Sequence, residues 1–152
     1  MYTEFSDAEQ LIIKRAIFIL ESKHIINDVA FNNADEAKDY LRLSIGGDDR
    51  EIFGVLFLDT KHRLISFDKL FLGSSNHVSV HAKELAKAFM KHNASCVILA
   101  HNHPSGDVSP SKADILITKK IVEALNLLDG EVLDHIIVSK IDAYSFKECG
   151  KL

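Results

Sequence analysis

The sequence has few residues that cross-link a chain and no run that could cross a membrane. Of its 152 residues, two are cysteine, two are proline and none is tryptophan. Cys96 lies in an apolar segment and Cys149 near the C-terminus, so they form neither a CxxC pair nor a disulfide framework, and both are expected to be reduced structural thiols. No apolar stretch approaches the ~18 residues of a membrane-spanning helix, and the polar N-terminus does not resemble a signal peptide. We therefore expect a cytoplasmic protein that does not enter the membrane.

The sequence also lacks an excess of positive charge. Eighteen lysines and arginines stand against 22 aspartates and glutamates, which gives a net charge of −4 at pH 7. Proteins that track the phosphates of nucleic acid without sequence preference usually carry a broad basic surface. The overall charge therefore does not indicate binding of this kind. Apolar residues make up 47% of the chain, which is enough for the core of one domain of ordinary size.

Segments with helical spacing alternate with short apolar, β-branched runs. The helical spacing, with capping residues at Ser6 and Asn33, predicts four helices, over residues 6–23, 34–44, 79–92 and about 111–128. The apolar runs predict five strands, over residues 51–59, 63–73, 94–100, 131–139 and 143–146. The first two strands are expected to pair antiparallel. This order predicts a single domain of the α/β or mixed α+β class, with helices packed on a sheet.

Both prolines lie in "LAHNHPSGDVSPSKAD", residues 99–114, directly after an apolar strand. His101 and His103 are two residues apart, so in an extended chain their side chains project to the same side. Asp114 lies in the first turn of the next predicted helix, and the turn-forming residues between can bring its carboxylate back to the two imidazoles. Two nitrogens and one oxygen leave the fourth position of a tetrahedral Zn²⁺ for water, which is the pattern of a catalytic zinc site. The pKa of such a water is near ~7.

Each of these features also has a simpler structural explanation. Ser111 and Asp114 have the spacing S-x-x-D, which by itself is most often a helix N-cap. A single histidine at the end of a strand is usually solvated or hydrogen-bonded. Capping and metal ligation can coexist, however, and two histidines, a rigid turn and a carboxylate in this order are together hard to explain by structure alone. The combination favours a metal site.

The same residues carry a resemblance to a known family. His101, His103, Ser111 and Asp114 match H-x-H, seven residues and S-x-x-D, the JAMM metalloprotease signature of MPN-type domains. More narrowly, "LAHNHPSG", "PSKAD" and "VLDHIIVS" resemble the bacterial RadC family, whose members are often labelled DNA repair proteins. The resemblance covers roughly residues 50–140. Since longer relatives carry an N-terminal helix-hairpin-helix region, the chain resembles the short form of the family.

The resemblance implies a fold and a set of ligands. The expected fold is a curved mixed β-sheet flanked by helices, of the JAMM (MPN) or cytidine-deaminase-like architecture, in residues 48–152. Residues 1–47 are then a helical segment packed on this domain. The implied ligands of one Zn²⁺, which also holds a water, are His101, His103 and Asp114. Ser111 is implied to hydrogen-bond the oxyanion or the metal-bound water.

The resemblance also implies a catalytic glutamate from an earlier strand, acting as general base. Glu51, which opens the predicted strand 51–59, is our choice, and its simpler explanation is a charge at a strand end. Glu84, at the start of a predicted helix, is the alternative. His135 alternates with apolar neighbours, which favours a core histidine, and a residue that supports a metal ligand is the alternative. The other histidines are expected at the surface or at helix caps: His24, His62, His77, His81 and His92.

These observations lead to three functional hypotheses. The first is a zinc-dependent metallohydrolase of the JAMM type that cleaves a peptide or isopeptide bond in a protein or peptide substrate by means of metal-activated water. The second, from the family label, is a DNA-associated repair or recombination accessory or a nuclease. Phosphodiester cleavage commonly uses two ions and more carboxylates than this motif contains. The third is a non-catalytic MPN-like scaffold, which has no chemical need for the complete ligand set.

Overall fold

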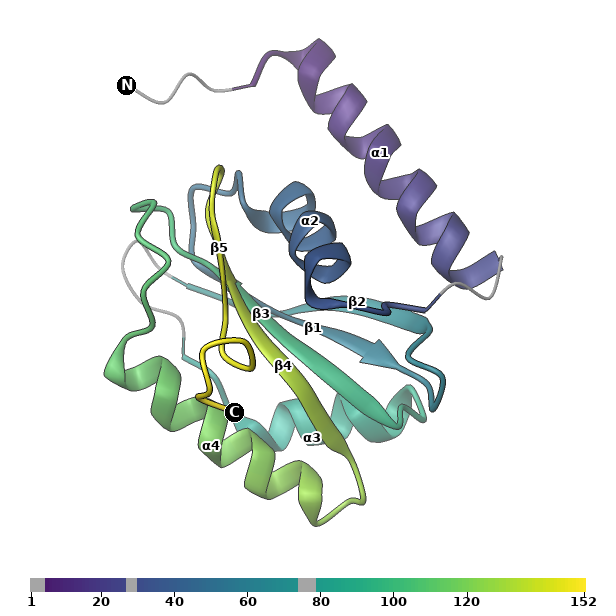
Figure 1. Ribbon diagram of the computed structural model, residues 1–152, viewed down its shortest axis with the longest axis vertical. Helices are drawn as coiled ribbons and strands as arrows, with labels where there is room; N and C mark the ends of the chain where they lie inside the picture. Colours follow the sequence, from purple (N-terminus) through teal and green to yellow (C-terminus); the bar gives the residue numbers. More distant parts are fainter. Residues whose placement is uncertain (1–4, 27–29, 74–78) are drawn as a thin grey trace.

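The computed structural model describes residues 5–26, 30–73 and 79–152 (Figure 1). This part of the chain contains four helices and five strands: α1 (Asp7–Ile26), α2 (Ala34–Ile45), β1 (Ile52–Leu58), β2 (Leu64–Leu72), α3 (Ala82–Lys91), β3 (Cys96–Asn102), α4 (Lys112–Asn126), β4 (Glu131–Val138) and β5 (Ala143–Ser145). The number and order of elements agree with the sequence prediction. The largest shifts are at the end of α1, which reaches Ile26 instead of residue 23, and at the start of α3, which begins at Ala82 instead of residue 79. None of the described helices is both long enough and apolar enough to cross a bilayer.

The strands form one mixed sheet in the order β2-β1-β3-β4-β5. β1 pairs antiparallel with β2, as expected, and also with β3. β3 and β4 run parallel and are joined by α4, which is the usual helical crossover between parallel strands. β5 adds an antiparallel edge to β4. The predicted fold class, a single mixed α+β domain with helices on a mixed sheet, is confirmed.

Helices cover both faces of the sheet (Figure 1). On one face, the side chains of Tyr40 and Leu41 from α2 pack in the same cluster as Leu56 of β1. On the other face, α3 and α4 contribute Leu85 and Ile121 to a second cluster. Because β1 and β3 are covered on both sides, every residue of these two strands is buried, and this accounts for their apolar sequences, which in β3 extend up to His101. The boundary that we expect between residues 47 and 48 stays a prediction.

The helix α1 lies outermost, beyond α2 in Figure 1. Its start is the capping arrangement that the sequence predicts, with the Ser6 backbone N–H donating to Glu9 Oε2 at 2.7 Å. The apolar residues of α1 recur at helical spacing, but they do not all pack against the rest of the protein. Ile17 and Leu20 pack against the core, whereas Leu11, Ile12 and Phe18 on other sides of the helix are more than 60% exposed.

Both cysteines are free thiols, which agrees with the expected absence of a disulfide. Cys96 is buried in β3, and this burial raises the pKa of its thiol to about 11. Cys149 is exposed, so the expectation that it is a structural thiol is wrong for this residue. The segment around Cys149, near the C-terminus, has no apolar pattern from which burial of its side chain could have been inferred.

Gly46, at the end of α2, lies against backbone on two sides. A methyl group at this position would lie 2.5 Å from the Arg42 carbonyl oxygen and 2.7 Å from the Ser139 carbonyl oxygen. Since backbone atoms cannot rotate away, we expect Gly46→Ala to lower the free energy of unfolding by about 1–3 kcal/mol. Urea denaturation measures the change. Gly47→Ala is the control, because its methyl group would meet only the Phe5 ring at 3.4 Å. Equal stability of the two variants would contradict the prediction.

Candidate metal centre

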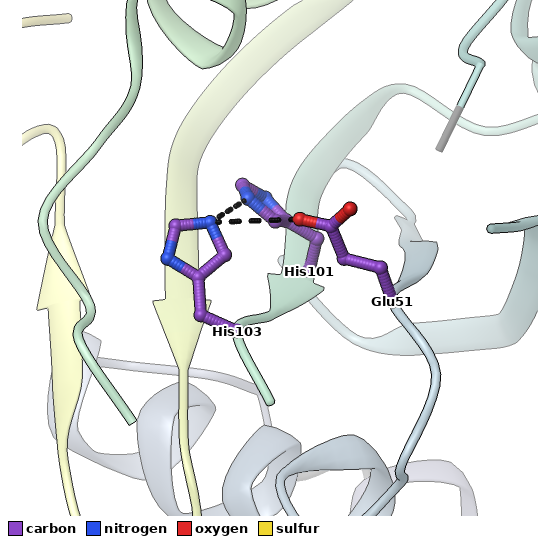
Figure 2. Close-up of side chains that lie close together, drawn as sticks. All are labelled: Glu51, His101 and His103. Atoms are coloured by element: carbon purple, nitrogen blue, oxygen red, sulfur yellow. Dashed lines mark hydrogen bonds and ion pairs between the residues drawn. The ribbon is translucent and has the colours of Figure 1, made fainter. Parts of the chain in front are cut away.

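The centre lies where β1 begins and β3 ends. In the antiparallel ladder Phe53 pairs with His101, and the same register continued by two residues places Glu51 opposite His103. The side chains meet accordingly, with Glu51 Oε1 3.9 Å from His103 Nε2. Figure 2 shows the carboxylate and the two imidazoles converging from these two segments. The proximity of Glu51 to the histidines therefore follows from strand pairing.

The two histidines present their Nε2 atoms to each other at a distance of 2.8 Å (Figure 2). His101 is buried at the end of β3, where its ring stacks on that of Phe53. His103 follows the strand and remains partly exposed, with 14% of its side chain accessible. Its Nδ1 donates to the Asp107 carbonyl oxygen at 2.6 Å, because a carbonyl can only accept. Nε2 of neutral His103 therefore carries a lone pair that faces His101.

Asp114 reaches the same nitrogens from the first turn of α4. Its Oδ1 lies 3.2 Å from His101 Nε2, and its Oδ2 lies 3.6 Å from His103 Nε2. Asp114 also forms the capping box of α4, in which the Ser111 N–H donates to Oδ2 at 2.7 Å and the Asp114 N–H donates to Ser111 Oγ at 3.1 Å. The S-x-x-D spacing thus caps the helix and at the same time directs a carboxylate toward the histidines.

The ionisation of the centre reflects this arrangement. Burial by itself would raise the pKa of Asp114, but the imidazoles of His101 and His103, which donate to its carboxylate whenever their Nε2 atoms are protonated, hold that pKa well below its usual range. Burial would likewise lower the pKa of His103, yet the bonds to Asp114 and to the Asp107 carbonyl raise it. Asp114 is therefore ionised at neutral pH and supplies negative charge next to the two rings.

This donor set fits a divalent transition metal. Two nitrogen lone pairs that face each other at 2.8 Å repel unless a proton or a cation lies between them. Imidazole nitrogen and carboxylate oxygen are ligands that Zn²⁺ commonly binds. Glu51, His101 and His103 each offer a ligand atom within 4.8 Å of the others, and Asp114 faces the same nitrogens. An ion held between the rings would therefore have both carboxylates within reach.

A family model described as "RadC-like JAB domain" matches residues 31–151, which is most of the chain and includes every residue of this centre. The chain belongs to the RadC-like JAB domain family. This confirms the resemblance to the RadC family and the MPN-type fold that the motif implies.

Curated proteins of similar sequence carry family names without an activity. The chain is 49% identical over 115 residues to UPF0758 protein RSc2444 of Ralstonia nicotianae (strain ATCC BAA-1114 / GMI1000), covering 76% of this chain and 51% of that protein. It is 44% identical over 144 residues to UPF0758 protein YeeS of Escherichia coli (strain K12), covering 95% of this chain and 97% of that protein. The chain thus spans about half the length of some relatives and nearly all of others.

The sequence did not single out Asn102, which lies between the two histidines of this RadC-like JAB domain. Its side chain is fully buried, and its Oδ1 accepts from the Ile52 N–H at 2.7 Å. Its Nδ2 donates to the carbonyl oxygens of Asp48 and Arg50 at 3.0 and 2.9 Å. These three partners bracket Glu51 along the chain. The only signal in the sequence is an amide at the end of an apolar strand, where a buried polar group needs partners.

His135 and Thr118 lie directly behind His101. His135 is completely buried in β4, between the rings of Phe53 and Phe146, and its Nε2 lies 2.9 Å from His101 Nδ1. Burial holds the pKa of His135 well below its usual value, and a positive charge on neighbouring His101 would lower it further. The expectation of a buried histidine is met, but this one also contacts a histidine of the centre.

The remaining candidates of the RadC-like JAB domain lie elsewhere. Glu84 is half exposed in the first turn of α3, and its Oε1 pairs with Lys87 Nζ at 3.1 Å. His81 precedes α3 without a capping side-chain bond, and His92 Nε2 lies 2.6 Å from Asp68 Oδ2. His62 is exposed and has a left-handed backbone conformation, with φ of 60°. The predictions for His77 and for the side chain of His24 fall outside the described residues.

Proposed function

We propose that this protein is a zinc-dependent metallohydrolase of the JAMM type that cleaves a peptide or isopeptide bond. The observation that carries the proposal is the approach of His101 Nε2 and His103 Nε2 to 2.8 Å, with the carboxylates of Asp114 and Glu51 beside them. Membership of the RadC-like JAB domain family supports it. In this proposal the metal ligands are His101, His103 and Asp114.

Zinc bound at such a site lowers the pKa of a coordinated water to about 7 and polarises a substrate carbonyl. Residues of the chain carry out the proton transfers and stabilise the developing negative charge. Glu51 takes a proton from the attacking water and delivers it to the leaving amine. Its place opposite His103, with 20% of its side chain accessible, supports this role because the carboxylate can reach both the centre and an entering substrate. Glu84 has no comparable position, since its carboxylate pairs with Lys87.

Ser111 is the proposed donor to the oxyanion that forms when water attacks the carbonyl. In the capping box its Oγ is an acceptor, so the hydroxyl hydrogen remains available for donation. A donor directed at developing negative charge stabilises the transition state. Since Ser111 lies three residues before Asp114, one helix start holds both the proposed donor and a proposed ligand.

Metal binding tests the proposed ligands. We expect the purified protein to bind one zinc ion per chain, and His103→Ala to bind it more than about 100-fold more weakly, because loss of a residue that merely supports a ligand already costs 10–100-fold. Metal analysis and competition with a chromophoric chelator measure both. His81→Ala is the control, because His81 is exposed and takes no part in the centre.

Assays on peptide, isopeptide and DNA substrates then test the reaction. Amide cleavage that stops with a chelator and returns with zinc supports the proposal. A protein that binds no zinc, yet binds DNA or a partner protein, would overturn it in favour of the accessory or scaffold hypotheses. Those two hypotheses otherwise stay predictions.

A further inference from the structure

A buried chain of hydrogen bonds runs from the metal centre to the backbone of α4. His101 Nδ1 lies 2.9 Å from His135 Nε2, and His135 Nδ1 lies 2.6 Å from Thr118 Oγ1. Thr118 Oγ1 donates in turn to the Asp114 carbonyl oxygen at 2.6 Å. These hydrogen bonds thus link β3, β4 and α4. The last of them ends on the backbone of Asp114, which we propose as a metal ligand.

The direction of donation in this chain is set at its far end. A carbonyl oxygen has no hydrogen, so at 2.6 Å the Thr118 hydroxyl must donate to Asp114. The hydroxyl has only one hydrogen, so Thr118 Oγ1 can only accept from His135, whose Nδ1 must carry the proton. A completely buried imidazole with no carboxylate at either nitrogen is neutral, and its Nε2 therefore has a lone pair.

The same reasoning extends to His101. The lone pair of His135 Nε2 requires a proton on His101 Nδ1, and neutral His101 then has a lone pair on Nε2. That atom is the one that faces His103 and Asp114. We propose that Thr118 and His135 are positioning residues that hold His101 in the tautomer able to bind a metal, an inference that rests on the proposed zinc site.

The opposite direction would disable the centre. If Thr118 donated to His135, the proton of His135 would lie on Nε2 and that of His101 on Nε2 as well, where the metal should bind. Thr118 Oγ1 and the Asp114 carbonyl would then be two acceptors 2.6 Å apart, which is unfavourable. Since the acceptor is a backbone carbonyl, it has no hydrogen to donate and cannot exchange roles with the Thr118 hydroxyl, as a side-chain hydroxyl or amide could. The fold therefore determines the tautomer of His101 before a metal binds.

The wild-type protein without metal provides the direct test. Nitrogen NMR of the histidine rings at neutral pH distinguishes a protonated Nδ1 from a protonated Nε2. We expect His135 and His101 both to carry the proton on Nδ1. A proton on His135 Nε2 would overturn the inference whether or not zinc binds. Failure of the wild-type protein to bind zinc, with the expected tautomers present, would instead count against the proposed function alone.

A pair of variants tests the consequence for the metal. Thr118→Val keeps the shape of the side chain but removes the hydroxyl, so we expect the tautomer preference of His135 to be lost and zinc affinity to fall about 10–100-fold. Thr118→Ser keeps the hydroxyl, and we expect the NMR pattern to be retained and zinc affinity to change less than about threefold. Thermal unfolding of both variants identifies any general loss of structure. Equal zinc affinity of the two variants, or a purely structural loss in Thr118→Val with unchanged tautomers, would contradict the inference.

Discussion

Glu51→Gln is expected to retain zinc and to lose catalysis. Glutamine has the size of glutamate but cannot take a proton from water at neutral pH, and a general base usually contributes about 10²–10⁴-fold to the rate. We therefore expect kcat on a cleavable peptide to fall by about that factor while the zinc content stays at one ion per chain. The measurement combines steady-state kinetics with metal analysis of the same preparation.

Glu84→Gln is the matched control for this experiment. Glu84 is an exposed residue whose carboxylate pairs with Lys87, and exposed pairs of this kind contribute little to stability, so we expect unchanged kcat and zinc content. Two results would contradict the assignment of Glu51. Full activity would show that another group is the base. Loss of zinc would show that Glu51 is a ligand, an arrangement that its distances to His101 and His103 also permit.

The candidate site could be predicted from the sequence as far as its residues are close together in the chain. His101 and His103 are neighbours in one strand end, and Ser111 and Asp114 begin the next helix, so their spacing alone indicates that they can converge. Glu51 is different, because its place opposite His103 depends on the register between β1 and β3. The sequence predicts both strands but not their register. From the sequence alone, Glu84 is therefore an alternative to Glu51 as the catalytic glutamate.

For the same reason, the supporting roles of Asn102 and Thr118 could not be predicted from a local sequence pattern. The three partners of Asn102 come from a segment about 50 residues earlier in the chain, as the bonds to Ile52, Asp48 and Arg50 show. Thr118 meets His135 across 17 residues, from helix to strand. A threonine inside a helix and an asparagine at a strand end have many common roles, so only the packed fold distinguishes these roles from ordinary ones.

The fold was predictable where burial is nearly complete. β1 and β3 are covered on both faces, so their sequences are largely apolar runs that indicate central strands. α1 shows the opposite case. Apolar residues such as Leu11 and Phe18 suggest a buried face, yet these two side chains are exposed, and among the described side chains of α1 it is others, such as Ile17, that pack against the core. A helical period shows which residues share a face of the helix, but not which face packs against the rest of the protein.

Asn102→Asp is expected to destabilise the protein strongly although the side chain keeps its size. The aspartate oxygen in place of Nδ2 would face the carbonyl oxygens of Asp48 and Arg50, leaving two buried acceptors without donors and adding a buried charge. We expect the free energy of unfolding to fall by about 3–5 kcal/mol, measured by urea denaturation. Asn126→Asp, at the exposed end of α4, is the control and should cost only a few tenths of a kcal/mol through the helix dipole.

The consequence of Asn102→Asp for the centre can be separated from its effect on stability. The bonds of Asn102 hold the chain on both sides of Glu51, so in the fraction that remains folded at low temperature we expect Glu51, the proposed general base, to be displaced while the proposed ligands His101 and His103 keep their positions. Lower kcat at unchanged zinc content per folded chain is then the expected result. Stability and kcat both equal to those of the wild-type protein would show that the three hydrogen bonds of Asn102 do not determine where Glu51 lies.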